Sequence, residues 1–118
     1  MWSAIDVAKA AQMLDTADLI AARAAADMDS IASTGPLSYN ARARVRADIG
    51  WAVQNVTEAI SLLLTAHGSA AFAEASPIQR FWRDQAVVAR HGYVSPPITY
   101  EIYGKALLGV DDTMSTIL

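Results

Sequence analysis

The sequence predicts an all-α fold, an antiparallel up-down helical bundle. Alanine, the strongest helix former, is abundant, and apolar residues recur at helical spacing over two long segments. No stretch alternates with the period of two that marks a β-strand. The 118 residues are 53% hydrophobic and 18% charged, which suggests one domain over residues 1–118 with a surplus of apolar side chains. We therefore expect some apolar surface to be buried against another polypeptide.

The first helix is expected over residues 4–31, with Ser3 as its N-cap. Alanine side chains on this helix allow a neighbouring helix to approach closely. Its predicted buried stripe consists of Val7, Ala10, Leu14, Ala17, Ala21, Ala25 and Met28.

A turn at Gly35 and Pro36 separates this helix from a second one over residues 39–67. Ser38 is the expected N-cap of the second helix. Gly68 follows its last residue, in the position where glycine commonly ends a helix.

Three arginines, Arg42, Arg44 and Arg46, open the second helix. Positive charge is unfavourable near a helix N-terminus. Two interpretations are open for them. The side chains either meet a carboxylate or another anion elsewhere, or they are solvated.

Two shorter helices are expected over residues 77–91 and 96–108. Ser76 followed by Pro77 is a strong start signal, because proline is favoured at the first helical position. Gly92 is expected to stop the third helix, and the segment after Gly109 is expected to be a loose end.

The third helix carries the densest polar segment, SPIQRFWRDQAVVARH, residues 76–91. Arg80, Asp84 and His91 share one helical face. Asp84 and His91 stand two turns apart, about 10 Å along the axis, so Asp84 can pair with Arg80 but not with His91. His91 lies at the C-terminal end of the helix, where it either caps the last carbonyls or transfers protons near neutral pH.

Few other residues suggest chemistry. The two histidines lack the spacing of a metal site, no cysteine is present, and His67 is expected to cap the second helix. No glycine-rich phosphate-binding loop is found. Tyr100 and Tyr103 either pack in the core or line one wall of a cavity.

The composition also argues against some partners and locations. A net charge of −3 gives no reason to propose nucleic acid or an anionic membrane as a partner. The apolar runs are too short to span a membrane, and no signal peptide is visible. We therefore expect a cytoplasmic protein.

Residues 76–91, followed by YEIYGKALLG at 100–109, resemble the C-terminal helical domain of the acyl-CoA dehydrogenase superfamily. The likeness is greatest to the branch of two-component flavin-dependent monooxygenases. Arg80, Arg83 and Asp84 form an R-x-x-RD run, His91 follows seven residues after Asp84, and a YG-x-x-LLG pattern closes the match at Gly109. The resemblance extends from the first helix to residue 110.

The resemblance implies roles for particular residues. It implies that His91 faces the flavin and the substrate as a catalytic residue. Arg80 and Arg83 would shape the flavin site and a subunit interface. The cofactor-binding loop that would meet the flavin of a neighbouring subunit contains His67, Gly68 and Ser69.

The implied function is hydroxylation of a small organic, often aromatic, substrate with reduced FMN or FAD from a reductase. One alternative is acyl-CoA dehydrogenation, although RHGYVSPP at 90–97 replaces the YEGT-like motif with its basic glutamate. Another is a non-catalytic helical oligomerisation module that binds no flavin when alone.

The resemblance further implies that the first bundle helix and a flavin-holding β-domain lie outside this sequence. A bundle that lacks one helix exposes an apolar groove. The expected partners are therefore those flavin-holding domains or a complementary chain, and further copies of the chain in a dimer or tetramer.

Overall fold

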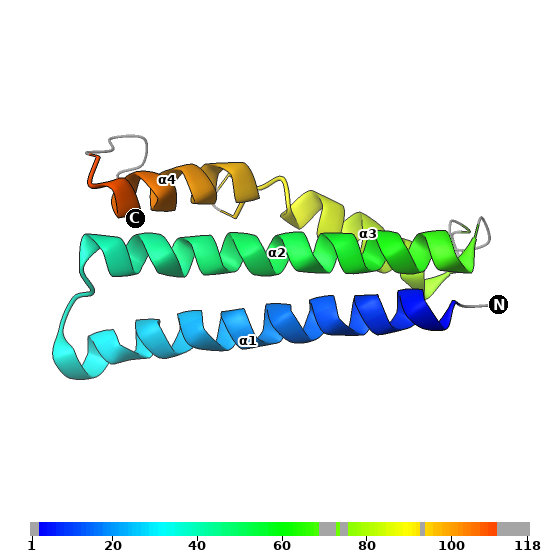
Figure 1. Ribbon diagram of the computed structural model, residues 1–118, viewed down its shortest axis with the longest axis horizontal. Coiled ribbons are helices and arrows are strands. Elements are labelled where there is room, and N and C mark those ends of the chain that lie inside the picture. The colour runs from blue at the N-terminus through cyan, green and yellow to red at the C-terminus, as the bar shows by residue number, and fades with distance from the viewer. Residues whose placement is uncertain (1–2, 69–72, 74–75, 93, 111–118) are drawn as a thin grey trace.

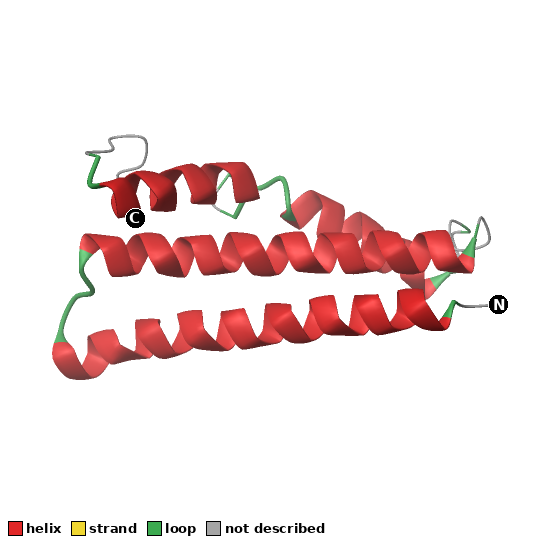
Figure 2. Ribbon diagram, viewed as in Figure 1, coloured by secondary structure: helices red, strands yellow, loops and turns green. Residues whose placement is uncertain are grey.

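The computed structural model describes residues 3–68, 73, 76–92 and 94–110, and this part of the chain contains no β-strand. Two long helices run antiparallel side by side, and two shorter ones lie along the second (Figures 1 and 2). The all-α prediction is confirmed. The helices are α1 (Ala4–Thr34), α2 (Tyr39–His67), α3 (Pro77–Val88) and α4 (Pro96–Leu108).

The helix α2 is the one that the other three contact. It packs against α1, α3 and α4, whereas no other pair of described helices is in contact. The buried residues of α2 are mostly small or polar: Ala43, Val45, Arg46, Ala47, Asp48, Gly50, Ala59 and Leu64. None of the described helices combines the length and apolar character needed to cross a bilayer.

The ends of the long helices follow the expected capping chemistry. The Ser3 and Ser38 hydroxyls accept hydrogen bonds from backbone N–H groups three residues ahead, at 3.4 and 3.2 Å, which confirms both N-caps. Gly68 ends α2 with a φ of 90°, which glycine adopts without a Cβ penalty. The end of α1 lies at Thr34, three residues beyond the expected one, before Gly35 with a φ of 94°.

The line of α1 that packs on α2 differs from the predicted stripe. Ala10, Ala17 and Ala24 are buried at a spacing of seven residues, the repeat that keeps two inclined helices in contact. Val7, Leu14 and Met28 form a parallel row and remain 43%, 39% and 47% exposed. The predicted stripe was right at Ala10 and Ala17, missed Ala24, and was wrong at its other five members, which are exposed: Val7, Leu14, Ala21, Ala25 and Met28. We call Val7, Leu14 and Met28 the outer row of α1.

The helix α3 ends earlier than expected, at Val88 instead of residue 91. The N–H of Ala89 still donates four residues back, to Gln85, but the next two donate three residues back: Arg90 to Val87 at 3.2 Å and His91 to Val88 at 3.1 Å. Residues 89–91 therefore form a tighter turn before Gly92. No residue of α3 is fully buried, so this helix lies on the surface of α2.

The helix α4 approaches α2 most closely at Gly50. The Thr99 side chain is fully buried, and its hydroxyl lies where a Cβ on residue 50 would stand. The same hydroxyl donates to the Pro96 carbonyl at 3.0 Å, which fixes its orientation. A cluster of Ala43, Ile102 and Ala106 continues this contact.

We expect Gly50→Ala to lower the free energy of unfolding by about 1–3 kcal/mol, because the new methyl group collides with Thr99 in a packed contact. Urea denaturation followed by circular dichroism measures this change. The matched control is Gly104→Ala in α4, where nothing lies within 4 Å of the added Cβ. It should stabilise the protein by up to about 1 kcal/mol, and an equal gain at both glycines would contradict the close approach.

Candidate functional site

The charged residues predicted on the third helix have exposed side chains in α3. Arg80 Nε is 3.9 Å from Asp84 Oδ2, which confirms that this aspartate pairs with an arginine. Both side chains are largely exposed, and such pairs contribute little to stability. The structure also places Arg83 on this helix with an exposed side chain. These charges are therefore available to a partner.

His91 lies in the turn between α3 and α4, and its side chain is exposed. Its carbonyl accepts hydrogen bonds from the N–H groups of Val94 and Ser95, at 3.0 and 2.9 Å. Its own N–H donates to the last residue of α3. The backbone of His91 therefore joins the end of α3 to the start of α4 and holds the imidazole at this junction.

The predicted cofactor loop lies at the other end of α3. His67 is the last residue of α2, and the N–H of Gly68 donates to Leu64 at 3.0 Å. Ser69 lies outside the described residues. Since α3 runs back along α2, its twelve residues, about 18 Å long, separate His67 from His91 (Figure 1). The described chain does not gather these residues into one pocket, and their role toward a flavin stays a prediction.

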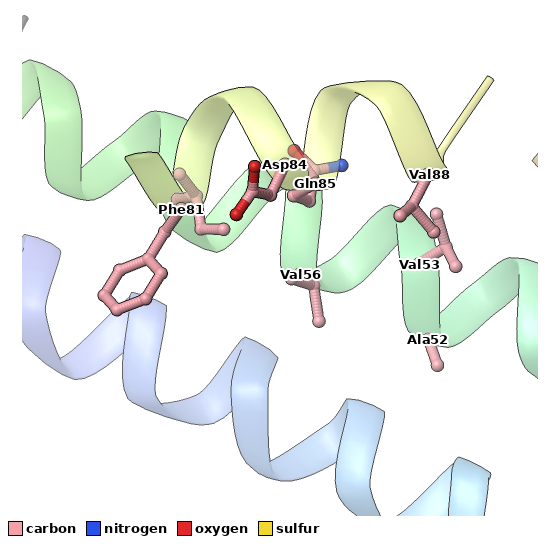
Figure 3. Close-up of a pocket in the computed structure, with 8 residues that line it drawn as sticks. Ala52, Val53, Val56, Phe81, Asp84, Gln85 and Val88 are labelled. Atoms are coloured by element: carbon pink, nitrogen blue, oxygen red, sulfur yellow. The ribbon is translucent and has the colours of Figure 1, made fainter. Parts of the chain in front are cut away.

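A pocket of about 450 Å³ lies between α2 and α3, and we call it the α2–α3 pocket. Figure 3 shows Asp84 and Gln85 between Phe81 on one side and Val88, the last residue of α3, on the other. The amide nitrogen of Gln85 donates to the Thr57 hydroxyl, which ties α3 to α2. The lining consists of Ala52, Val53, Val56 and Ile60 from α2, and Phe81, Asp84, Gln85 and Val88 from α3.

A second pocket, of about 350 Å³, lies between α1, α2 and α4 and is called the α1–α2–α4 pocket. Tyr100 and Tyr103 line it, so the cavity-wall interpretation holds for both, and Tyr103 also packs against the core cluster as the other interpretation expected. The rings of Trp51 and Tyr100 are tilted by 56° with centroids 6.3 Å apart, a favourable aromatic arrangement. The Tyr100 hydroxyl donates to Gln54 Oε1 at 2.6 Å. The other lining residues are Ile20, Arg23, Ala47 and Asp48.

A partly buried ion pair forms the polar end of the α1–α2–α4 pocket. Arg23 Nε and Nη2 donate to the two carboxylate oxygens of Asp48, at 3.0 and 2.6 Å. The Asp48 side chain is 6% exposed and that of Arg23 49%. The hydrogen bond and the charge of Asp48 together raise the pKa of Arg23. This two-pronged geometry is the stronger kind of arginine–carboxylate contact.

Sequence reasoning missed this pair, although it left a signal. Asp48 falls between Val45 and Ala52 in an apolar stripe, and an acid in such a place needs a cationic partner. A second pair, Arg44 with Asp27 at 2.5 Å, also links α2 to α1. It confirms that one of the three arginines opening α2 meets a carboxylate. Among the described residues, no cluster of three or more histidines and acids could hold a metal ion.

Comparisons with known proteins agree with the helical architecture. Residues 2–96 match a family described as "Acyl-CoA dehydrogenase, C-terminal domain". The chain is 34% identical over 86 residues to HsaA, the oxygenase subunit of a flavin-dependent monooxygenase from Mycobacterium tuberculosis. That alignment covers 71% of this chain and 22% of HsaA.

Two further proteins are similar over part of their length. The oxygenase component of p-hydroxyphenylacetate 3-hydroxylase from Acinetobacter baumannii is 30% identical over 66 residues, which cover 56% of this chain and 16% of that protein. The structure of XiaF from Streptomyces sp., in complex with FADH2 and glycerol, superposes with a TM-score of 0.89 and 37% identity. It covers 98% of this chain and 30% of XiaF. The chain thus spans less than a third of these relatives.

Substituting Arg23 and substituting Asp48 should lower the free energy of unfolding by different amounts. Arg23→Met leaves a buried carboxylate unpaired and should cost about 2–4 kcal/mol of unfolding free energy. Asp48→Asn leaves a half-exposed guanidinium that water can solvate and should cost about 1–2 kcal/mol. Urea denaturation of both single variants and of the double variant checks this order. Equal losses would contradict the different burial of the two groups.

Tyr100 should ionise at higher pH than a free tyrosine. Burial raises the pKa of Tyr100, and the negative charge of Glu58 adds to the effect. The stability that this shift provides is fully present below the ordinary tyrosine pKa of about 10 and is lost as pH rises through the folded-state pKa. Stability measured across this alkaline range should fall less steeply in Tyr100→Phe than in the unmodified protein. Parallel pH profiles would contradict the assignment.

Proposed function

Because the chain belongs to the acyl-CoA dehydrogenase C-terminal domain family, we propose that it is the C-terminal helical part of a flavin-dependent monooxygenase oxygenase component. The observation that carries the proposal is its 34% identity to HsaA together with its superposition on XiaF. The reaction would be hydroxylation of a small organic, often aromatic, molecule. We favour it over acyl-CoA dehydrogenation because RHGYVSPP at 90–97 lacks the basic glutamate expected of a dehydrogenase.

The cofactor in this proposal is a reduced flavin delivered by a separate reductase. When bound, it supplies the electrons that activate molecular oxygen. The FADH2 bound to XiaF favours FAD over FMN. Arg80 and Arg83 fit a flavin phosphate, because both present exposed guanidinium groups on one helix. Their surroundings are open, so this chain offers one wall of a site and other walls must come from elsewhere.

His91 is the group proposed to move a proton in the reaction. A neutral imidazole nitrogen can accept a proton from a substrate hydroxyl. The N–H groups of Val94 and Ser95 donate hydrogen bonds to the His91 carbonyl. These bonds hold the backbone of His91, from which the imidazole ring extends. The exposed position lets a substrate reach it from outside the bundle.

The proposed partners cover apolar surfaces that the described chain leaves in water. The outer row of α1 and the exposed Phe81, Val87 and Leu108 have the character of association surfaces. Since α1 and α4 both pack on α2 but not on each other, one more helix could lie between them and cover the α1–α2–α4 pocket. We assign this position to the missing bundle helix. The other surfaces would serve self-association into a dimer or tetramer and contact with the flavin-holding domains.

The test is His91→Asn in the oxygenase assembled with its flavin-holding domains, supplied with reduced flavin and oxygen. Loss of a general base typically slows a reaction by about 10²-fold or more, so hydroxylated product should fall by that factor. Oxygen consumption should continue and yield hydrogen peroxide instead.

The matched control is Asp29→Asn, an exposed residue of α1 outside the proposed site. It should leave product yield and peroxide unchanged. An unaltered rate and an unaltered ratio of product to peroxide in His91→Asn would show that His91 has no catalytic part. Absence of any hydroxylation by the unmodified assembly would reject the monooxygenase function itself.

A further inference from the structure

We infer that Gln85 and Thr57 are positioning residues: the hydrogen bond between them holds α3 in one orientation on α2 and thereby sets where His91 stands. The inference rests on the proposed function, because it concerns the imidazole assigned to the reaction. Both side chains act through the position of His91 rather than on the reacting atoms.

The packing of α3 leaves its orientation open. This helix contacts α2 and no other described helix, and none of its residues is fully buried. The α2–α3 pocket of about 450 Å³ lies between the two helices, so side chains do not fill the space that a small movement of α3 would need. The apolar contacts around it are non-directional. A directional contact is therefore needed to select one orientation of α3.

The hydrogen bond from Gln85 to Thr57 supplies this direction. The Thr57 hydroxyl carries one hydrogen, which it donates to the Val53 carbonyl at 2.8 Å. Its oxygen can therefore only accept from α3, so the Gln85 amide must turn its NH2 group toward α2. Both side chains are half-buried, where water competes less for the bond.

His91 moves with α3. Its N–H group donates to the Val88 carbonyl at 3.1 Å, so a hydrogen-bonded turn joins it to the end of the helix. Gln85 lies six residues before His91, about 9 Å along the helix direction. A side chain reaches about 5–6 Å from a helix axis, so a roll of α3 by about 10° displaces it by roughly 1 Å. A misplacement of this size can slow a reaction by about 100-fold.

The chain on the other side of His91 is already fixed on α2. The helix α4 has fully buried residues, which α3 lacks. The Tyr100 hydroxyl of α4 also donates at 2.6 Å to Gln54, which lies three residues before Thr57 and so on the same face of α2. Because packing holds α4, the hydrogen bond of Gln85 decides the position of the junction that carries His91.

The first test is amide hydrogen exchange in the 118-residue chain, which needs neither flavin nor substrate. Thr57→Val keeps the shape of the side chain and removes the acceptor. The amides of residues 81–91 should then exchange about fivefold faster, as expected for the loss of one hydrogen bond. Those of α1 and α4 should not change. Thr57→Ser keeps the hydroxyl and should retain the original rates.

A double-variant cycle shows whether the two side chains act on each other. Gln85→Met removes the donor and should accelerate exchange as much as Thr57→Val, with no further increase when both are combined. The matched control is Thr16→Val. The Thr16 hydroxyl makes the same kind of bond within α1, to the Gln12 carbonyl at 2.8 Å. Its removal should leave exchange in α3 unchanged.

The second test uses the oxygenase assembled with its flavin-holding domains. Thr57→Val should lower the kcat of hydroxylation by roughly 10–100-fold and raise the share of hydrogen peroxide, because a displaced imidazole takes up the substrate proton less efficiently. The KM for substrate and the affinity for reduced flavin should stay within about twofold, whereas general loss of structure would change both. Thr57→Ser should recover most of the kcat.

Unchanged exchange of α3 in Thr57→Val would overturn the inference, and so would equal acceleration in all the helices. An unchanged kcat of Thr57→Val in an assembly that hydroxylates would overturn it too and leave the proposed function standing. An unmodified assembly that forms no product is a different outcome. It rejects the proposed function, and with it the positioning role, even where the exchange rates change as expected.

Discussion

The constraint on which the structure depends is that α2 must pack against three helices at once. A helix contacted on several sides can keep its neighbours close only if it presents small side chains to them. Ala47 and Gly50 meet this need, and Gly50 admits the Thr99 side chain of α4. The same crowding buries Asp48, which then requires Arg23 from α1 as its partner. The small side chains of α2 thus fix how closely α4 approaches, and the ion pair of Asp48 with Arg23 fixes the position of α1.

Much of this architecture follows from the sequence. The serines at both N-caps and the glycines after α1 and α2 are local signals, and local geometry satisfies them. The buried row of α1 was not predictable in this way. Two apolar rows, both spaced by seven residues, run side by side, and periodicity cannot say which of them faces α2. The end of α3 was missed because its last turn tightens before Gly92, which propensity does not encode.

The residues of the candidate site were easier to predict from the sequence than their positions relative to one another. Helical spacing placed Arg80 and Asp84 as a pair, and the tyrosines of α4 do form a cavity wall. Helical spacing could not reveal the pairing of Arg23 with Asp48, because 25 residues separate them in the chain. The polar groups of α3 stand on an open surface, so the flavin site proposed for them would need further polypeptide around it.

The central claim is that this chain supplies one wall of a flavin site and that the remaining walls come from other domains. Equilibrium titration of reduced and oxidised FAD into the chain alone, and into the chain assembled with the flavin-holding domains, tests it most directly. The account predicts no measurable binding to the chain alone and stoichiometric binding to the assembly. Stoichiometric binding of FAD to the isolated 118 residues would contradict it.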